Sequence, residues 1–341
     1  MNRGYIHLQV GNEPEARGYF NLLRDRFPEH EAVRGTHYEV GEHCKDLPDR
    51  KRAFALFFMI QKERLSGWKL NREVYMDREP FVAGQFYPGS AAALDEKLSG
   101  YLQGEQASVR TLLAMVPHAG YPFSGPVAGK VLARSNLAER IILLGPNHTG
   151  RGQRIAVWED GRWILPGSEV PVDEDTASVI GKLSGYSFDY QAHLSEHSLE
   201  VVLPFLARAV PGCKIVPIAV AEPDPQVLMR AGEDLARTIK DLALDVSLVV
   251  STDMSHFVPQ EHAKRLDQMA IERILDLDPL GLHQVVRQNS ISMCGVMPMT
   301  LGLACAREMG AKSTEFIDYA TSGDAIGDYS QVVGYAGVVV S

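Results

Sequence analysis

The sequence has few cysteines and no long apolar run, and each shortage excludes a class of protein. Four cysteines among 341 residues are too few for a scaffold built on disulfides, and they form no Cys-x-x-Cys pair. The longest uninterrupted apolar run, residues 53–60, is far shorter than the roughly 20 residues of a membrane-spanning helix. The first residues lack the apolar core of a signal peptide. We therefore expect a cytoplasmic protein with reduced thiols and no membrane segment.

Basic residues are also in the minority. The chain has 34 Lys and Arg against 43 Asp and Glu, a net charge of −9. It therefore lacks the broad basic surface that binds nucleic acids through counterion release, and we expect no nucleic-acid partner. A Gly-x-Gly-x-x-Gly turn, a Walker P-loop and a Gly-x-Ser-x-Gly elbow are all missing from the sequence, so three common nucleotide-binding and hydrolase motifs are absent.

The composition changes near residue 78. Residues 1–78 carry interleaved basic and acidic groups, whereas from Glu79 onward apolar runs are separated by Gly and Pro. We predict an N-terminal segment of unknown role over residues 1–78 and a larger domain over residues 79–341.

Within the larger domain, short apolar runs alternate with stretches that suit helices. The predicted strands are 112–116, 140–144, 215–220, 246–250, 316–319 and 332–340. Runs without a polar face indicate strands buried on both sides. The pattern therefore predicts an α/β fold with a mixed, mostly parallel central sheet and helices on both faces. The last two strands are expected to be antiparallel neighbours.

Two local features are also predicted. Asp160-Gly161, between two apolar segments over residues 155–164, is a good turn for a β-hairpin. Ser195 can cap a helix that continues to Ala209, with a kink at Pro204.

Histidines follow three of the predicted strands. His118, His148 and His256 come shortly after the strands that end near residues 116, 144 and 250, and Asp253 accompanies the third. A single histidine after a strand is usually an ordinary loop residue. Because ligands bind at the carboxyl ends of strands in open α/β sheets, we interpret these side chains as one functional rim.

Neutral imidazoles are common ligands for zinc, copper, iron and nickel. His118 and His148 need a third ligand, and Cys294 is the best cysteine because a helix is predicted to begin just after it, where the dipole stabilises a thiolate. Cys213 and Cys305 fit better as buried, inert thiols. His37 and Cys44 could form a second metal site, but this interpretation is less favoured.

Asp253 and His256 lie three residues apart and would share a face if the chain turned helically there. A histidine beside a carboxylate can act as a general base; the alternative is a structural turn. Glu196 and His197 begin a predicted helix, and His197 is expected beside the rim rather than as a ligand. The histidines expected on the surface are His193, His262 and His283.

Several motifs together resemble the Memo family, which in prokaryotes is the B component of the AmmeMemoRadiSam system. They are Pro117-His118-Ala119-Gly120-Tyr121, Gly145-Pro146-Asn147-His148, Glu196-His197-Ser198-Leu199-Glu200, Ser251-Thr252-Asp253-Met254-Ser255-His256 and Cys294-Gly295, preceded by Phe81-Val82-Ala83-Gly84-Gln85-Phe86-Tyr87-Pro88. The resemblance covers residues 79–341.

The resemblance implies a fold similar to that of class III extradiol dioxygenases, non-haem iron enzymes with two His and one Glu as ligands. By this likeness, His118 and His148 match the two His ligands and Cys294 takes the place of the carboxylate. His256 matches the acid/base position, with Asp253 beside it. The residues expected to line the pocket are His197, Asn147, Tyr121 and Glu196.

The implied function is a metal-binding protein, most simply an iron- or copper-dependent oxidoreductase that acts on a small molecule or a modified residue. A thiolate is softer than a carboxylate and also suits zinc. Two alternatives are a catalytically silent, dioxygenase-like pocket that binds a peptide or protein, and a zinc-type metal hydrolase. The implied partners are radical-SAM and AMMECR-type proteins.

Overall fold

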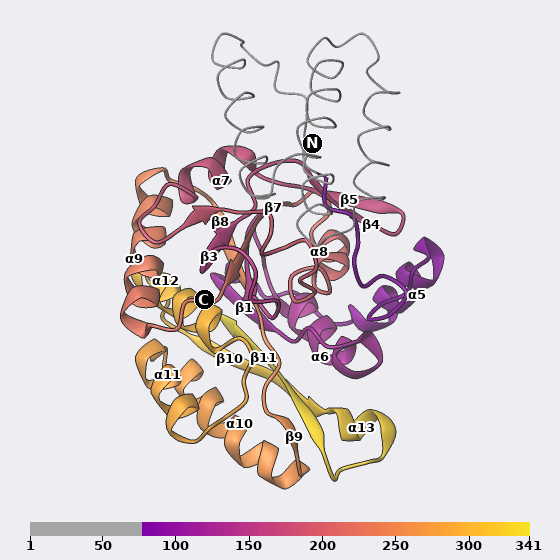
Figure 1. Ribbon diagram of the computed structural model, residues 1–341. Helices are drawn as coiled ribbons and strands as arrows, with labels where there is room; N and C mark the ends of the chain where they lie inside the picture. Colours follow the sequence, from indigo (N-terminus) through magenta and orange to yellow (C-terminus); the bar gives the residue numbers. More distant parts are fainter. Residues whose placement is uncertain (1–76) are drawn as a thin grey trace, which may run out of the picture. The chain divides into compact units, whose positions relative to one another are not determined.

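The computed structural model describes residues 77–341, which Figure 1 draws in colour. His37 and Cys44, the less favoured second metal site, lie outside the described residues, as does nearly all of the predicted N-terminal segment. Its last residue, Arg78, is buried in the described part. The predicted boundary between residues 78 and 79 stays a prediction.

A central sheet runs through the described domain in the order β10-β11-β1-β8-β2-β7-β3-β6, and β9 pairs with β11 (Figure 1). The strands are β1 (Leu113–Val116), β2 (Arg140–Pro146), β3 (Ile155–Val157), β6 (Ser187–Phe188), β7 (Lys214–Val220), β8 (Val246–Ser251), β9 (His256–Val258), β10 (Thr314–Thr321) and β11 (Val332–Val340). A separate ribbon consists of β4 (Arg162–Leu165) and β5 (Ser168–Pro171). Strands β1, β8, β2 and β7 are mutually parallel, whereas β11 is antiparallel to β1, β9 and β10. The predicted mixed sheet is confirmed.

Helices cover both faces of this sheet. They are α5 (Ala91–Tyr101), α6 (Tyr121–Arg134), α7 (Glu174–Ile180), α8 (Leu203–Ala209), α9 (Pro225–Asp241), α10 (Gln260–Leu275), α11 (Pro279–Gln288), α12 (Val296–Met309) and α13 (Ser322–Ile326). On β11, Gly337 faces Val131 of α6, whereas Gly334 faces Asp267 of α10. Since residues at odd spacing on a strand face opposite sides, α6 and α10 lie on opposite faces of the sheet.

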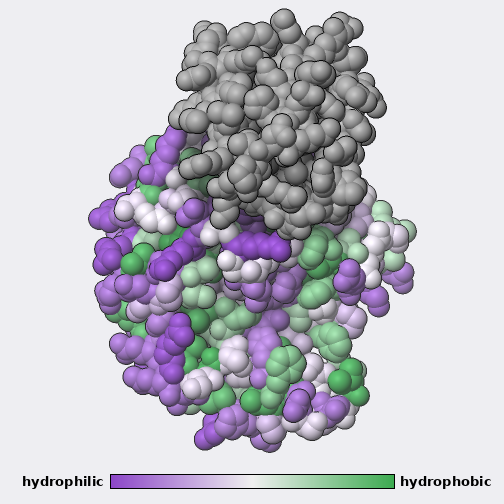
Figure 2. Space-filling view, viewed as in Figure 1, coloured by the Kyte–Doolittle hydropathy of each residue, from purple (hydrophilic) through white to green (hydrophobic). Residues whose placement is uncertain are grey.

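The inner strands carry the core of the domain. Every residue of β1 and β8 is buried, as expected of strands covered on both faces. Cys213 and Cys305 are buried, in agreement with the prediction. At the surface, hydrophilic residues predominate on the left side of the view in Figure 2, and hydrophobic residues are scattered among polar ones over the rest of the coloured face. None of the helices within residues 77–341 combines the length and apolar character needed to cross a bilayer.

The predicted hairpin over residues 155–164 was wrong. Although Gly161 makes a turn with φ of +78°, β3 joins the central sheet by pairing with β7 and β6, and β4 pairs instead with β5. The true hairpin turns at Gly167, whose φ of +80° favours glycine. The turn at Gly161 was predicted correctly. The pairing of β3 and β4 was not, because their partners come from other parts of the chain.

The predicted helix from Ser195 to Ala209 was also wrong in its first half. Only α8, which begins at Leu203, is helical, and the preceding residues form turns. Pro204 lies in the first turn of α8 and therefore begins the helix rather than kinking it. The turns are held by tertiary contacts, because Arg78 donates to the carbonyl of Glu196.

Two of the three histidines expected at the surface are buried. His262 is exposed, but His193 and His283 are buried. The His193 ring packs edge-on against Trp158 and Trp163, with ring centroids 5.8 and 5.9 Å away. Its Nε2 donates to the carbonyl of Ala156 at 3.0 Å. Burial is the largest effect on its pKa and lowers it to about 3.

His193 should make the domain sensitive to acid. The unfolded imidazole has a pKa of about 6.5, so between pH 6.5 and 3 the unfolded chain binds a proton that the folded chain does not. The stabilisation is full above pH 6.5 and falls toward pH 3, by up to about 1.4 kcal/mol per pH unit. We expect His193→Gln, which keeps a donor for Ala156, to flatten this loss in urea unfolding at a series of pH values. His262→Gln is the exposed control, and identical slopes in all three proteins would contradict the prediction.

Candidate metal centre

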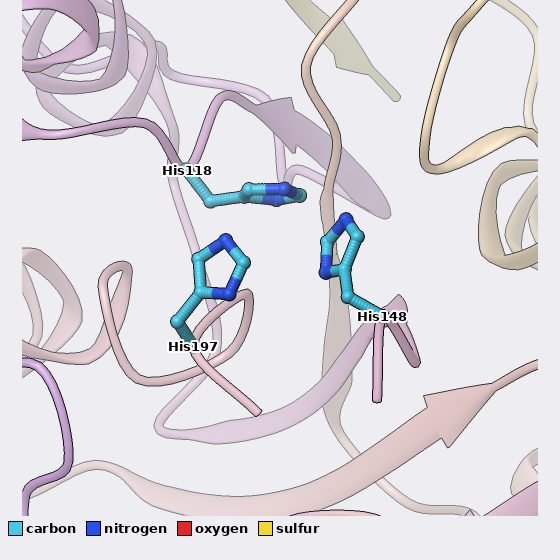
Figure 3. Close-up of side chains that lie close together, drawn as sticks. All are labelled: His118, His148 and His197. Carbon is cyan, nitrogen blue, oxygen red and sulfur yellow. The ribbon is translucent and has the colours of Figure 1, made fainter. Parts of the chain in front are cut away.

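Three imidazoles converge at the carboxyl ends of the parallel strands (Figure 3). His118 follows β1, His148 follows β2, and His197 lies in the turns before α8. One ligand nitrogen from each lies within 4.8 Å of the others. The ring of His118 is 5.3 Å from that of His148 and 5.4 Å from that of His197, and the rings of His148 and His197 are 4.8 Å apart, centroid to centroid. This group could hold a metal ion.

In two of these rings, Nδ1 contacts another side chain of the protein. His148 Nδ1 is 2.8 Å from Glu196 Oε1, and the other oxygen of Glu196 accepts the backbone N–H of His148. His118 Nδ1 contacts the hydroxyl of Ser251. Nε2 of each ring is therefore left as the atom available to an ion. A carboxylate behind an imidazole is the usual support of a metal-ligating histidine.

The electrostatics of the site favour the forms of His118, His197 and Glu196 that metal binding needs. Burial, followed by the neighbouring imidazoles, holds the pKa of His118 well below its ordinary value, and burial also lowers the pKa of His197. Burial by itself would raise the pKa of Glu196. The hydrogen bond and charge of His148, the N–H of Ser198 and the charge of His197 outweigh it and bring that pKa to about 2. Burial thus favours the neutral form of His118 and of His197, while Glu196 stays ionised.

Cys294 lies beside this group rather than within it. Its Sγ is 3.4 Å from Nε2 of His118 and accepts the backbone N–H of Asp253 at 3.2 Å. It is not among the residues whose ligand atoms all lie within 4.8 Å of one another. Helix α12 begins at Val296, close to the predicted start. Even so, burial and then the charge of Asp253 raise the pKa of the thiol. The stabilisation of a Cys294 thiolate by the helix dipole, and the role of Cys294 as a ligand, stay predictions.

Asp253 and His256 have separate partners in the structure. Asp253 Oδ1 accepts the backbone N–H of His118 at 2.8 Å, and burial raises its pKa to about 6 against the opposing effects of that N–H and of His256. Nδ1 of His256 is 2.9 Å from the carbonyl of Ser292. Because His256 begins β9, the chain is extended there and the expected helical face is wrong. The proton-transfer roles of both residues stay predictions.

Asn147 and Tyr121 support the chain around the imidazoles. The side-chain oxygen of Asn147 accepts the backbone N–H groups of Thr149 and Gly150, each at 3.1 Å, and so fixes the loop that carries His148. The hydroxyl of Tyr121 donates to the carbonyl of Val201 at 3.0 Å, next to the turns that carry His197. Both side chains are thereby committed to backbone partners.

The sequence analysis missed a buried ion pair behind the site. Arg78 donates from Nη1 to Glu200 at 2.7 Å and from Nη2 to the carbonyl of Glu196 at 2.7 Å. Glu200 also accepts the backbone N–H of Phe81 at 2.9 Å and the hydroxyl of Tyr87 at 2.8 Å. Glu200 belongs to a motif that the sequence singled out. Nothing local to Arg78 indicated its partner, which lies 122 residues away.

Comparisons with known proteins agree with the motifs. A family model described as Memo-like protein matches residues 78–339. The chain belongs to the Memo family. A MEMO1 family protein of Methanopyrus kandleri is 40% identical over 279 residues, which cover 77% of this chain and 99% of that protein. A MEMO1 family protein of Aquifex aeolicus is 41% identical over 266 residues, with 77% and 98% covered. The resemblance found in the sequence is confirmed.

A solved structure is more distantly similar. An uncharacterized protein from Escherichia coli K12 matches with a TM-score of 0.46 and 12% identity, over 67% of this chain and all of that one. A similarity this low supports no statement about function.

Proposed function

We propose that this Memo-family chain holds one transition-metal ion and acts as an iron- or copper-dependent redox enzyme on a small molecule or a modified residue. His118, His148 and His197 hold the ion, and Cys294 is the fourth residue of the centre, on the side of His118. The convergence of the three imidazoles is the observation that carries the proposal.

The donor atoms fit such an ion. Neutral imidazoles bind iron, copper, zinc and nickel, and a thiol beside them adds a soft donor that favours copper. Nitrogen and sulfur ligands of one tetrahedral ion, at about 2.0 and 2.3 Å from it, lie roughly 3.5 Å apart. The 3.4 Å between Cys294 Sγ and His118 Nε2 matches that separation. Sγ is not within 4.8 Å of all three imidazole donors, so Cys294 would have to move toward His148 and His197 to become a ligand. The bound metal would supply electron transfer and polarisation of the substrate.

The protein's own residues would bind and move protons around this centre. Asp253 fixes the backbone of His118 and thereby the position of that ring. A carbonyl only accepts hydrogen bonds, so the carbonyl of Ser292 requires the proton of His256 to be on Nδ1. Nε2 of His256 is then the basic atom, and it would accept a proton from the substrate.

A zinc hydrolase is the second candidate. Three histidines with an open position are also the ligand set of catalytic zinc sites, and the carboxylate behind His148 suits either metal. The identity of the metal therefore separates the two functions. The partner proteins and the cytoplasmic location expected from the sequence stay predictions.

Metal analysis of the full chain, purified without oxygen and without added metal, tests the proposal. We expect one iron or copper ion per chain and an electron paramagnetic resonance signal in a suitable oxidation state. His197→Ala and Cys294→Ser should each change that signal, because each removes a donor, and His262→Ala should not. If the purified chain holds only zinc and cleaves its substrate with water, the redox proposal is contradicted and the zinc hydrolase takes its place.

A further inference from the structure

Phe257 occupies an unusual position in β9. Val258 pairs with Val332 and His256 pairs with Val333, so Phe257 is the extra residue of a β-bulge. Its φ of +57° lies in the left-handed region, which a bulky aromatic residue rarely adopts. Bulges of this kind reorient side chains next to functional sites.

The bulge brings Phe257 to the side of His256. Consecutive side chains of a regular strand point to opposite faces, which would separate the two rings. Here the ring centroids of His256 and Phe257 are only 5.9 Å apart. Ser292 fixes His256 through its hydroxyl, which accepts the backbone N–H at 2.7 Å, and through its carbonyl. The ring of Phe257 therefore lies against a histidine that is already held in place.

This arrangement is unfavourable for the domain taken alone. Phe257 is 71% exposed, more than any other large hydrophobic side chain among the described residues. A left-handed non-glycine residue and an aromatic ring in water both cost free energy. Such strain is found at sites where it serves binding or catalysis.

We propose that Phe257 contacts the substrate beside His256, and that the substrate carries an apolar or aromatic group that packs on this ring. The reacting group of the substrate would then lie between His256 and the ion. The inference rests on the proposed function, because it places the substrate by the position of His256 and the metal.

Two hydroxamates that bind a metal through the same group provide the test. Acetohydroxamate probes the metal alone, and 4-phenylbutanohydroxamate adds an apolar tail. Affinities are measured with the metal-loaded full chain and with Phe257→Asn, Phe257→Tyr and Phe316→Asn. Asparagine tolerates the left-handed region, so the bulge is kept. Phe316, on β10, is the exposed aromatic control.

We expect the intact chain to bind the phenyl-tailed hydroxamate about tenfold more tightly than acetohydroxamate, as an aromatic contact allows. Phe257→Asn should lose this preference, whereas Phe257→Tyr and Phe316→Asn should keep it. Phe257→Asn should also bind acetohydroxamate normally and unfold at the same or a higher urea concentration.

Each other outcome overturns the inference in a recognisable way. A preference that survives Phe257→Asn rejects the contact but leaves the metal centre standing. A lower urea midpoint together with weaker acetohydroxamate binding would show that the ring is structural. Failure of both probes to bind the metal-loaded chain would show that the ion has no position open to a ligand, which rejects a catalytic metal centre and the inference together.

Discussion

Glu196→Gln should weaken metal binding by roughly 10- to 100-fold, the usual effect of removing the carboxylate behind a ligating histidine. Glu196 holds Nδ1 of His148 at 2.8 Å and also accepts its backbone N–H. Glutamine keeps the size of the side chain but loses the charge, and its amide offers a donor where an acceptor is needed. The affinity is measured by competition with a chelator of known strength.

The matched control for this variant is Glu222→Gln. Glu222 is another buried carboxylate, but its partners are Arg154, at 3.3 Å, and the backbone N–H of Asp224, at 2.9 Å. This control should leave metal affinity unchanged. Equal affinities in the intact chain and in Glu196→Gln would show that His148 is not a ligand supported by this carboxylate.

Glu200→Gln should destabilise the domain by about 3–5 kcal/mol, because it leaves a buried guanidinium without its counter-charge. Arg78 and Glu200 are 2.7 Å apart and almost fully buried. The same carboxylate accepts the backbone N–H groups of Phe81 and Val82, each at 2.9 Å. The free energy of unfolding from urea titration measures the effect.

A double-mutant cycle separates the ion pair from its surroundings. Arg78→Met should also be strongly destabilising, whereas the double variant Arg78→Met/Glu200→Gln should lose clearly less than the sum of the two single losses, since neither charge is then left alone. Additive losses would mean that the two side chains act independently. Because Arg78 also binds the carbonyl of Glu196, both single variants should lower metal affinity.

Local patterns were enough to predict the sheet and the residues at its edge. Strands buried on both faces leave continuous apolar runs in the sequence, and their parallel arrangement brings His118 and His148 to one edge. These runs are found at β1, β2, β7, β8 and β11, close to the predicted bounds. The Memo motifs placed the same residues in a family, which the family model confirms.

The features that were missed depend on contacts between distant residues. His197 was expected beside the rim, but its approach to the other two imidazoles follows from turns in place of the expected helix, where Arg78 donates to the carbonyl of Glu196. The pKa of the Cys294 thiol is raised mainly by burial, and the sequence around Cys294 does not show that the thiol is buried. The bulge at Phe257 depends on the register between β9 and β11. None of these has a local sequence signal comparable to a histidine after a strand.

The most direct measurement of the central claim is the metal content of the intact chain compared with that of His118→Ala/His148→Ala. Both proteins are purified side by side without oxygen, and His262→Ala serves as the exposed control. We expect one transition-metal ion per chain in the intact protein and in the control, and almost none in the double variant, with urea unfolding confirming that it is folded. A metal-free intact chain, or equal metal content in all three, would contradict the account.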